Sequence, residues 1–145
     1  MMDEKGHMVR LEIDSELVNT TLVAMAVRGL CAMTTLSPVE VNRVELCIVE
    51  IVNNAIEHAY GGETGHKVEV DVNLLESSLS LTVSDWGKPM EENKLDAKDS
   101  SVDADAAVWL CSGRGLPIVQ SLMDKVEYQS VGDKNSFIMS KQFRS

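Results

Sequence analysis

The sequence lacks long apolar runs and has few aromatic side chains. No stretch approaches the roughly 18 apolar residues of a membrane-spanning helix, and the segment from Met1 to His7 lacks the apolar core of a signal peptide. Aromatic residues make up only 4% of the chain, so we expect an aliphatic core rich in methionine. The length suits a single domain, 1–145, and we expect it to be cytoplasmic with no membrane partner.

Cysteines are few, odd in number and far apart. Cys31, Cys47 and Cys111 do not have the spacing of a metal site. Buried free thiols in a reducing compartment account for them best. A catalytic cysteine is disfavoured because no accompanying His and Asn arrangement is visible.

Positive charge is also sparse, and the familiar phosphate-binding motifs are missing. Lys and Arg number 13 against 23 Asp and Glu, giving a net charge of −10. Such a surface disfavours direct contact with nucleic acid and would suit a basic protein partner, although solubility alone also explains it. The chain has no Walker-type loop, no Rossmann glycine fingerprint and no ordinary protein-kinase signature.

What the sequence does contain is a clear succession of strand and helix patterns. Alternation of apolar and polar residues predicts strands over 9–13, 67–74, 79–84, 126–130 and 136–143. Helical periodicity predicts helices over 17–33, 38–59 and 116–123, with a short helix over 103–111. Hairpins outnumber strand–helix–strand crossovers. We therefore expect an α/β (α+β) two-layer sandwich, with a mixed, mostly antiparallel sheet and helices on one face.

Two of the helices carry start signals. Asp14 or Ser15 can cap the first helix. Ser37-Pro38-Val39-Glu40 predicts a capping box at the second, with proline at the first helical position. Gly61-Gly62 should end that second helix.

The second helix has one face that is unusually rich in polar oxygen atoms. At about 100° per residue, Glu50, Asn53, Asn54 and Glu57 fall within an arc of roughly 100°. The opposite side is apolar and comprises Val41, Val44, Ile48, Val52, Ala55 and Ala59. A carboxylate that accepts a proton, one turn from an amide oxygen that binds a hard cation, could form a phosphate-and-magnesium site. A solvated helix face is the simpler interpretation.

Two other segments have residues suited to nucleotide binding. Asp85, at a strand end, could accept a hydrogen bond from an exocyclic amine while Gly87 lets a flat ring approach the backbone. An ordinary Asx turn would explain Asp85 equally well. Ser112-Gly113-Arg114-Gly115 precedes a helix, and backbone N–H groups there could bind an anion. Gly-x-Gly alone is weak evidence.

In this order, the three segments resemble a known family. The pattern of Glu50-x-x-x-Asn54, Asp85-x-Gly87 and Gly113-x-Gly115-Leu116 resembles the Bergerat-type ATP-binding fold of type II topoisomerases, Hsp90, histidine kinases and MutL. Within that superfamily, the chain is similar to the bacterial anti-sigma factor serine/threonine kinases of partner-switching systems. Two runs carry this likeness, namely 50–60 and 115–124.

The resemblance implies a role for each motif residue. Glu50 would be the general base, and Asn54 would coordinate the Mg²⁺ that bridges the ATP phosphates. Asp85 would bind the adenine amine with Gly87 beside the ring, and Ser136 would lie near the adenine through a water. The loop over the phosphates would include Gly113, Arg114, Gly115 and Leu116.

The chain departs from the family pattern at two places. Lys88-Pro89 stands where a second glycine usually follows Asp-x-Gly, and Asn135-Ser136 replaces the usual Gly-Thr. Neither change touches Glu50 or Asn54. The first departure is itself common among related anti-sigma kinases.

The activity implied by the resemblance is phosphoryl transfer between proteins. The chain would move the γ-phosphoryl group of ATP to a Ser or Thr of an anti-anti-sigma protein, and would sequester a sigma factor or another target, as a homodimer. A binding module of the same fold without catalysis is an alternative. A histidine kinase ATP-binding domain is another, but His7, His58 and His66 do not lie on a suitable upstream helix.

Overall fold

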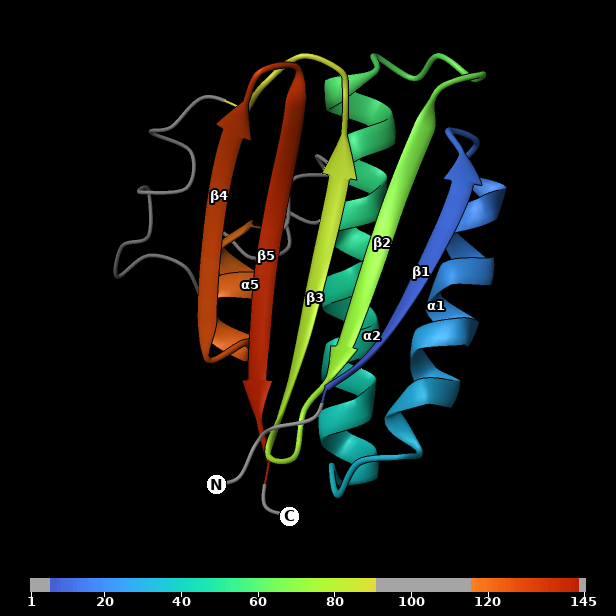
Figure 1. The fold of residues 1–145 in the computed structure, drawn as a ribbon. Coiled ribbons are helices and arrows are strands. Elements are labelled where there is room, and N and C mark those ends of the chain that lie inside the picture. The colour runs from blue at the N-terminus through green and yellow to red at the C-terminus, as the bar shows by residue number, and fades with distance from the viewer. Residues whose placement is uncertain (1–5, 91–115, 144–145) are drawn as a thin grey trace.

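The computed structural model describes residues 6–90 and 116–143 (Figure 1). The helix predicted over 103–111, Cys111 and the Gly113-Arg114-Gly115 motif lie outside the described residues. The elements are β1 (His7–Asp14), α1 (Val18–Cys31), α2 (Pro38–Asn54), the π-helix η1 (Ala55–Ala59), β2 (Lys67–Leu74), β3 (Ser78–Asp85), α5 (Leu116–Leu122), β4 (Lys125–Val131) and β5 (Lys134–Gln142).

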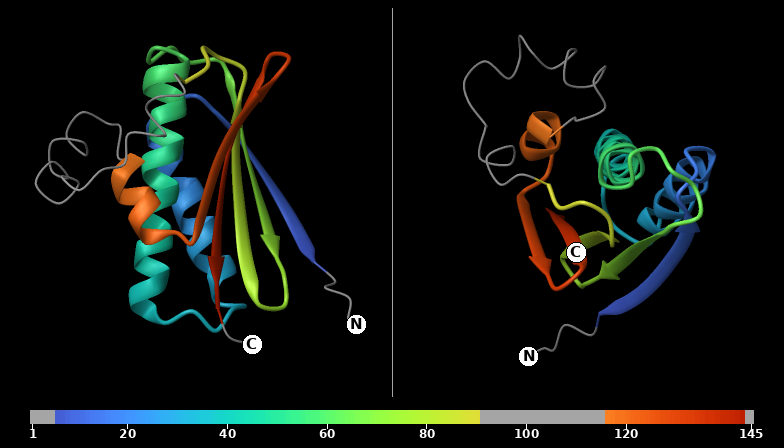
Figure 2. Two further views of the ribbon diagram at one scale, coloured as in Figure 1. Left: turned by 90° about the vertical axis from the view of Figure 1, so that its left-hand side faces the viewer. Right: turned by 90° about the horizontal axis from the view of Figure 1, so that it is seen from above.

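The molecule has two layers, a sheet and a layer of helices on one of its faces (Figure 2). The sheet has five strands in the order β1-β2-β3-β5-β4, and every pairing between them is antiparallel. One row of partners crosses the whole sheet, through Val9, Val72, Leu81, Met139 and Val126. The predicted fold class is confirmed, including the helices on one face.

The apolar side of α2 forms the centre of the core. Val44, Ile48 and Val52 are fully buried, as the helical periodicity predicts. Cys47 is also buried and is a free thiol, and burial raises its pKa to about 12. Burying each such aliphatic side chain is worth roughly 1.5–3 kcal/mol, so this face anchors α2 firmly to the sheet. None of the helices in 6–90 and 116–143 is long and apolar enough to cross a membrane.

The start of α2 confirms the predicted capping box. Ser37 Oγ accepts a hydrogen bond from the Glu40 backbone N–H at 3.2 Å, and Glu40 Oε1 accepts one from the Ser37 N–H at 3.1 Å. Pro38 occupies the first helical position. The local sequence alone was sufficient for this prediction.

The predicted cap of α1 is wrong. The residue before this helix is Leu17, which makes no side-chain cap. Ser15 instead donates to the Glu63 carbonyl at 2.6 Å and accepts from the His66 N–H at 3.1 Å, and Asp14 Oδ2 accepts from the Gly65 N–H at 3.1 Å. The end of β1 therefore binds the segment before β2, which is remote in sequence, and these polar groups are no longer available to the helix.

The second helix ends with one turn of π-helix. The backbone N–H of Tyr60 reaches the Ala55 carbonyl at 3.1 Å, five residues back. Gly61 and Gly62 then take positive φ values of 62° and 81°, and the chain leaves the helix as predicted. Single π turns are rare and occur frequently at functional sites.

Candidate functional site

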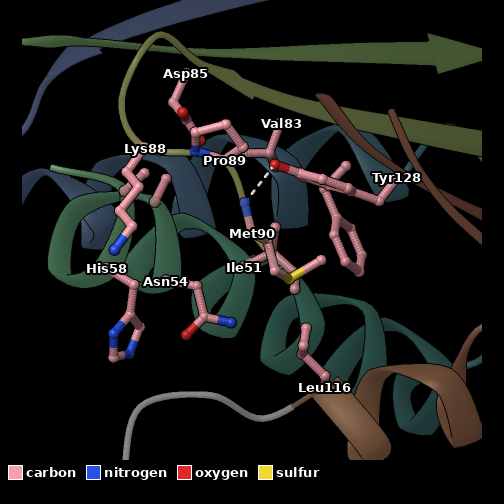
Figure 3. Close-up of a pocket in the computed structure, with 13 residues that line it drawn as sticks. Ile51, Asn54, His58, Val83, Asp85, Lys88, Pro89, Met90, Leu116 and Tyr128 are labelled. Carbon is pink, nitrogen blue, oxygen red and sulfur yellow. Dashed lines mark hydrogen bonds between the residues drawn. The ribbon is translucent and has the colours of Figure 1, made fainter. Parts of the chain in front are cut away.

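A cavity of about 270 Å³ opens between the end of α2, the end of β3, α5 and the β4–β5 hairpin (Figure 3). It is lined by Ile51, Asn54, Ala55, His58, Ala59, Val83, Asp85, Lys88, Pro89, Met90, Leu116, Tyr128 and Phe137. Apolar side chains from several elements form most of its wall, and Asp85 lies at the opposite end from Asn54 and His58 (Figure 3). This arrangement suits a ligand with a flat apolar body and polar groups at both ends.

Asp85 is the polar group at the strand end of the cavity. Its side chain is buried, and its Oδ1 accepts hydrogen bonds from Asn135 Nδ2 at 2.8 Å and from the Gly87 N–H at 3.0 Å. Within residues 6–90 and 116–143, no hydrogen bond reaches Oδ2. Burial raises the pKa of Asp85, while the bonds from Asn135 and Gly87 act to lower it. The bond from Gly87 is the Asx turn, and among the described residues it leaves Oδ2 as an acceptor oxygen without a hydrogen bond.

Gly87 is required by its close packing against the end of the π-helix. A Cβ at this position would lie 2.3 Å from the carbonyl oxygen of Ala59. That same oxygen accepts a hydrogen bond from the Lys88 N–H at 2.8 Å. The end of the π-helix therefore lies directly against the segment after β3, and no larger residue fits between them.

Two tyrosines hold this segment in place, and the sequence reasoning missed both. The Tyr60 hydroxyl accepts from the Trp86 N–H at 2.8 Å and donates to the Lys67 carbonyl at 2.6 Å. The Tyr128 hydroxyl accepts from the Met90 N–H at 2.8 Å. These are the two tyrosines of the chain, and their convergence on one segment comes from β4 and the end of η1 lying close to the β3 terminus.

Glu50 and Asn54 lie one turn apart on α2, as predicted, but only Asn54 lines the cavity. Glu50 is half-buried, and its pKa is raised first by burial and then by the negative charge of Glu57. A raised pKa makes a carboxylate a better general base near neutral pH. Glu50 therefore has an environment that favours proton acceptance, one turn from the amide that lines the cavity.

The polar arc on α2 serves two different surfaces. Asn53 accepts a hydrogen bond from Thr20 Oγ1 of α1 at 2.8 Å, and Asn53 and Glu57 line a separate groove against α1. Asn54 and His58 instead line the cavity. His58 thus lies where it could contact a ligand.

The remaining predicted residues are placed as follows. Leu116 is the first residue of α5, is buried and lines the cavity. Ser136 is buried, and its Oγ lies 3.0 Å from Ser84 Oγ, outside the set of lining residues. Gly113, Arg114 and Gly115 lie outside the described residues.

The donor set offers little for a metal by itself. In the part of the chain that the structure describes, no group of three or more His, Cys, Asp or Glu could hold a metal ion. Mg²⁺ keeps several waters and is bound by one or two protein oxygens together with substrate phosphates, so the single Asn54 amide fits this mode of binding. The apolar walls and the Asp85 carboxylate likewise fit a purine ring that bears an amine.

Comparison with protein families and curated proteins identifies consistent relatives. A family described as "Histidine kinase-like ATPase domain" matches residues 13–141. The serine-protein kinase RsbW of Listeria innocua is 24% identical over 121 residues, covering 82% of this chain and 77% of the relative. An anti-sigma F factor of Clostridium perfringens is 27% identical over 141 residues, covering 97% of each chain.

Solved structures support the same fold. The RsbU and RsbW domains of Rv1364c from Mycobacterium tuberculosis match with a TM-score of 0.64 at 17% identity, covering 92% of this chain and 32% of that one. This chain therefore spans about a third of that larger protein. The SiaB-SiaC complex from Pseudomonas aeruginosa matches with a TM-score of 0.53 at 15% identity, covering 90% of this chain and 88% of that one.

Proposed function

From the premise that this chain belongs to the histidine kinase-like ATPase family, we propose that it is an ATP-dependent protein serine/threonine kinase of a partner-switching module. It phosphorylates an anti-anti-sigma protein and, in a separate complex, sequesters a sigma factor or an equivalent target. The observation that carries the proposal is the cavity itself. One end holds an acceptor carboxylate, Asp85, the middle is apolar, and the other end holds the Asn54 amide one turn from Glu50.

Each residue has a distinct task in the proposed site. Asp85 accepts a hydrogen bond from the adenine amine, and the apolar walls exclude water from the two faces of the ring. Asn54 holds Mg²⁺, which neutralises charge on the phosphates when it is bound. Lys88 and His58 line the same cavity and provide N–H donors for the phosphate chain.

The proposed base is Glu50. It orients the Ser or Thr hydroxyl of the partner and accepts its proton as the phosphoryl group moves. Phosphoryl transfer needs positioning and charge neutralisation more than covalent chemistry from the protein, so few catalytic residues are required. The loop implied by Gly113, Arg114, Gly115 and Leu116 would close over the phosphates, and Ser136 would lie near the adenine.

A single substitution tests the kinase assignment. Glu50→Gln should bind ATP with unchanged affinity and lose transfer to the partner by about 100-fold or more, because general-base catalysis contributes roughly 10²–10⁴-fold. Radiolabelled ATP with the purified partner measures transfer, and calorimetry measures binding. Glu57→Gln, two turns from Glu50 on the same helical stretch, is the matched control and should retain transfer at pH 8. Wild-type transfer by Glu50→Gln would contradict the assignment.

The partner side of the proposal rests on the relatives. Their names include a serine-protein kinase and an anti-sigma F factor, and one solved neighbour is a two-protein complex. The test is capture of partners from the native cytoplasm with ATP or with ADP, followed by their identification. Nucleotide-dependent exchange between two proteins supports partner switching. Capture of one target without any transfer from ATP would favour the binding-only module instead.

Homodimerisation is proposed on the family resemblance alone. Light scattering of the purified chain at several concentrations should give twice the mass of one chain. A mass of one chain throughout would remove this part of the proposal. The kinase assignment would be unaffected, since the described cavity is built within one chain.

A further inference from the structure

Asn135 is a buried polar side chain that is hydrogen-bonded to Asp85, which lines the cavity. It lies near the start of β5, directly opposite Asp85 of β3 and Ser130 of β4 in the strand register. Only 2% of its surface is exposed. A buried amide must find hydrogen-bond partners, because leaving one unpaired costs roughly 1–3 kcal/mol.

The partners of Asn135 determine which way its amide points. Nδ2 donates to Asp85 Oδ1 at 2.8 Å and to the Gly87 carbonyl at 3.0 Å. Its Oδ1 accepts from the Ser130 hydroxyl. Both N–H bonds are therefore used, each on an acceptor. Reversing the amide would place Oδ1 against a carboxylate and a carbonyl, so the observed orientation is strongly preferred.

This orientation also determines what Asp85 can recognise. Its Oδ1 receives two donors, from Asn135 and from the Gly87 N–H. The carboxylate is thereby held in one plane, and Oδ2 is the oxygen left for a ligand among the described residues. An ionised carboxylate accepts hydrogen bonds and cannot donate one. It therefore binds a purine with a 6-amino group and repels the 6-oxo group of the corresponding oxopurine.

We propose that Asn135 is a positioning residue that makes this cavity selective for 6-aminopurine over 6-oxopurine nucleotides. It acts by fixing the Asp85 carboxylate and the Gly87 carbonyl in one arrangement. The inference rests on the proposed function, since it requires that Asp85 meets the base. It adds a residue that stands where the resembled family usually has glycine.

Loss of Asn135 should weaken selectivity in two ways. The Asp85 carboxylate loses its side-chain donor and can rotate away from the base. The same donor lowers the pKa of Asp85 against the effect of burial. Without it the carboxyl group is more readily protonated, and a protonated carboxyl group can donate to a 6-oxo oxygen.

Any measurement of ATP binding against pH must account for the other ionisable groups around Asp85. Tyr60, which directly follows η1, and Tyr128 of β4 face it, and burial raises the pKa of both, so they stay neutral. Lys88 and His58 line the cavity, and Lys67 and Lys134 lie over the Trp86 ring. The quantity to compare is therefore the difference between wild type and variant, which share all of these groups.

The experiment measures the Kd of the full chain for ATP and for inosine triphosphate, which carries a 6-oxo group. Wild type should prefer ATP by about tenfold or more, because a bond to a charged acceptor is lost with the oxopurine. Asn135→Ala should weaken ATP binding by about tenfold and bring the two Kd values close together. As the pH is lowered, ATP affinity should begin to decline at a higher pH in Asn135→Ala than in wild type.

Two further variants distinguish a change in nucleotide selectivity from a loss of stability. Ser130→Ala removes the hydroxyl that donates to Asn135 Oδ1, from a residue that is otherwise exposed, and should lower the preference for ATP by about threefold. Val72→Ala makes a cavity in the sheet core on β2 and should lower stability while keeping the wild-type preference. Thermal melts report the stability of every variant.

Different outcomes test the role of Asn135 and the proposed function separately. Failure of wild type to bind ATP would overturn the proposed function, and the inference with it. Wild-type preference for ATP that persists in both Asn135→Ala and Ser130→Ala would overturn the role of Asn135 alone. An equal loss of preference in Val72→Ala would also overturn it, because the effect would then follow from instability.

Discussion

The two ends of the cavity are built differently. At the Asp85 end, side chains and backbone groups from β3, β4, β5 and η1 are joined by a dense set of hydrogen bonds through Asn135, Tyr60 and Tyr128. At the other end, Glu50, Asn54 and His58 are carried on one continuous helical stretch. The first end depends on how distant strands are aligned, and the second on helical periodicity.

This difference predicts separate roles for the two ends of the cavity. A group held from several elements is suited to rigid recognition, since its position cannot change without breaking several bonds. Groups on one helix can be changed singly with little effect on the rest of the site. We therefore expect changes at the Asp85 end to reduce binding, and changes at the Glu50 end to reduce transfer.

The largest effect is expected from Asp85→Ala. Removing the acceptor would abolish the proposed bond to the base amine and would leave Asn135 Nδ2 with the Gly87 carbonyl but without Asp85. ATP affinity measured by calorimetry should fall by about 100-fold or more. Affinity within about threefold of wild type would show that the base does not bind at this end.

Asn54→Ala tests the opposite end. With the amide oxygen gone, ATP binding should lose its dependence on Mg²⁺, while binding of metal-free ATP should change little. Titrations with Mg²⁺ and with a chelator measure the difference. An unchanged response to Mg²⁺ would contradict the metal assignment, and would leave the Asp85 end as the better supported half of the site.

Gly87→Ala should act through stability. The added Cβ would lie 2.3 Å from the Ala59 carbonyl oxygen, so the helix end must shift from the β3 terminus. Overpacking of this kind costs roughly 1–3 kcal/mol of the free energy of unfolding, measured by urea denaturation. Gly29→Ala in α1, where nothing lies within 4 Å of the added Cβ, is the matched control. It should be neutral or stabilising, by up to about 1 kcal/mol.

The smallest effect concerns the pH dependence of transfer. The pKa of Glu50 is raised by burial and by Glu57, so the rate should fall as the pH decreases through that raised pKa and the base becomes protonated. Glu57→Gln removes the second cause. The acid limb of the rate profile should therefore move to lower pH by a fraction of a unit. A shift to higher pH would contradict this electrostatic coupling.

For Asp85 and Glu50, a fall in pH should change stability and function in opposite directions. For Asp85 and Glu50 the pKa is raised above that of the unfolded chain. Between the unfolded and folded pKa values the native state binds more protons, so their contribution to stability rises as the pH falls. ATP affinity and transfer should decrease over the same interval, because both require the ionised form.

Several parts of the fold were predictable from short stretches of sequence. Alternation predicted β2 over Lys67–Leu74 with its bounds correct, and Ser37 with Glu40 predicted the start of α2. These signals depend on neighbours within one turn or one strand. The cap of α1 was wrong because Ser15 bonds to Glu63 and His66, some fifty residues away.

The residues of the candidate site also divide into those with a local sequence signal and those placed by distant contacts. Motif spacing predicted Glu50, Asn54, Asp85 and Gly87, and of these Asn54 and Asp85 line the cavity. Asn135 was noticed only as a departure from a family pattern, and its partners were not foreseen. No local pattern reveals that β3 and β5 pair with Asp85 opposite Asn135.

Periodicity and caps are local properties, so the chain's own residue order was enough to predict an antiparallel α/β sandwich with a polar helix face. Strand register and the approach of η1 to the β3 terminus depend on how the whole core packs. Those non-local contacts pack Gly87 closely against Ala59, leave Asp85 Oδ2 as an acceptor among the described residues, and place Asn53 and Asn54 on different surfaces. The physical reason is that a hydrogen bond between residues fifty positions apart exists only once the sheet has aligned them.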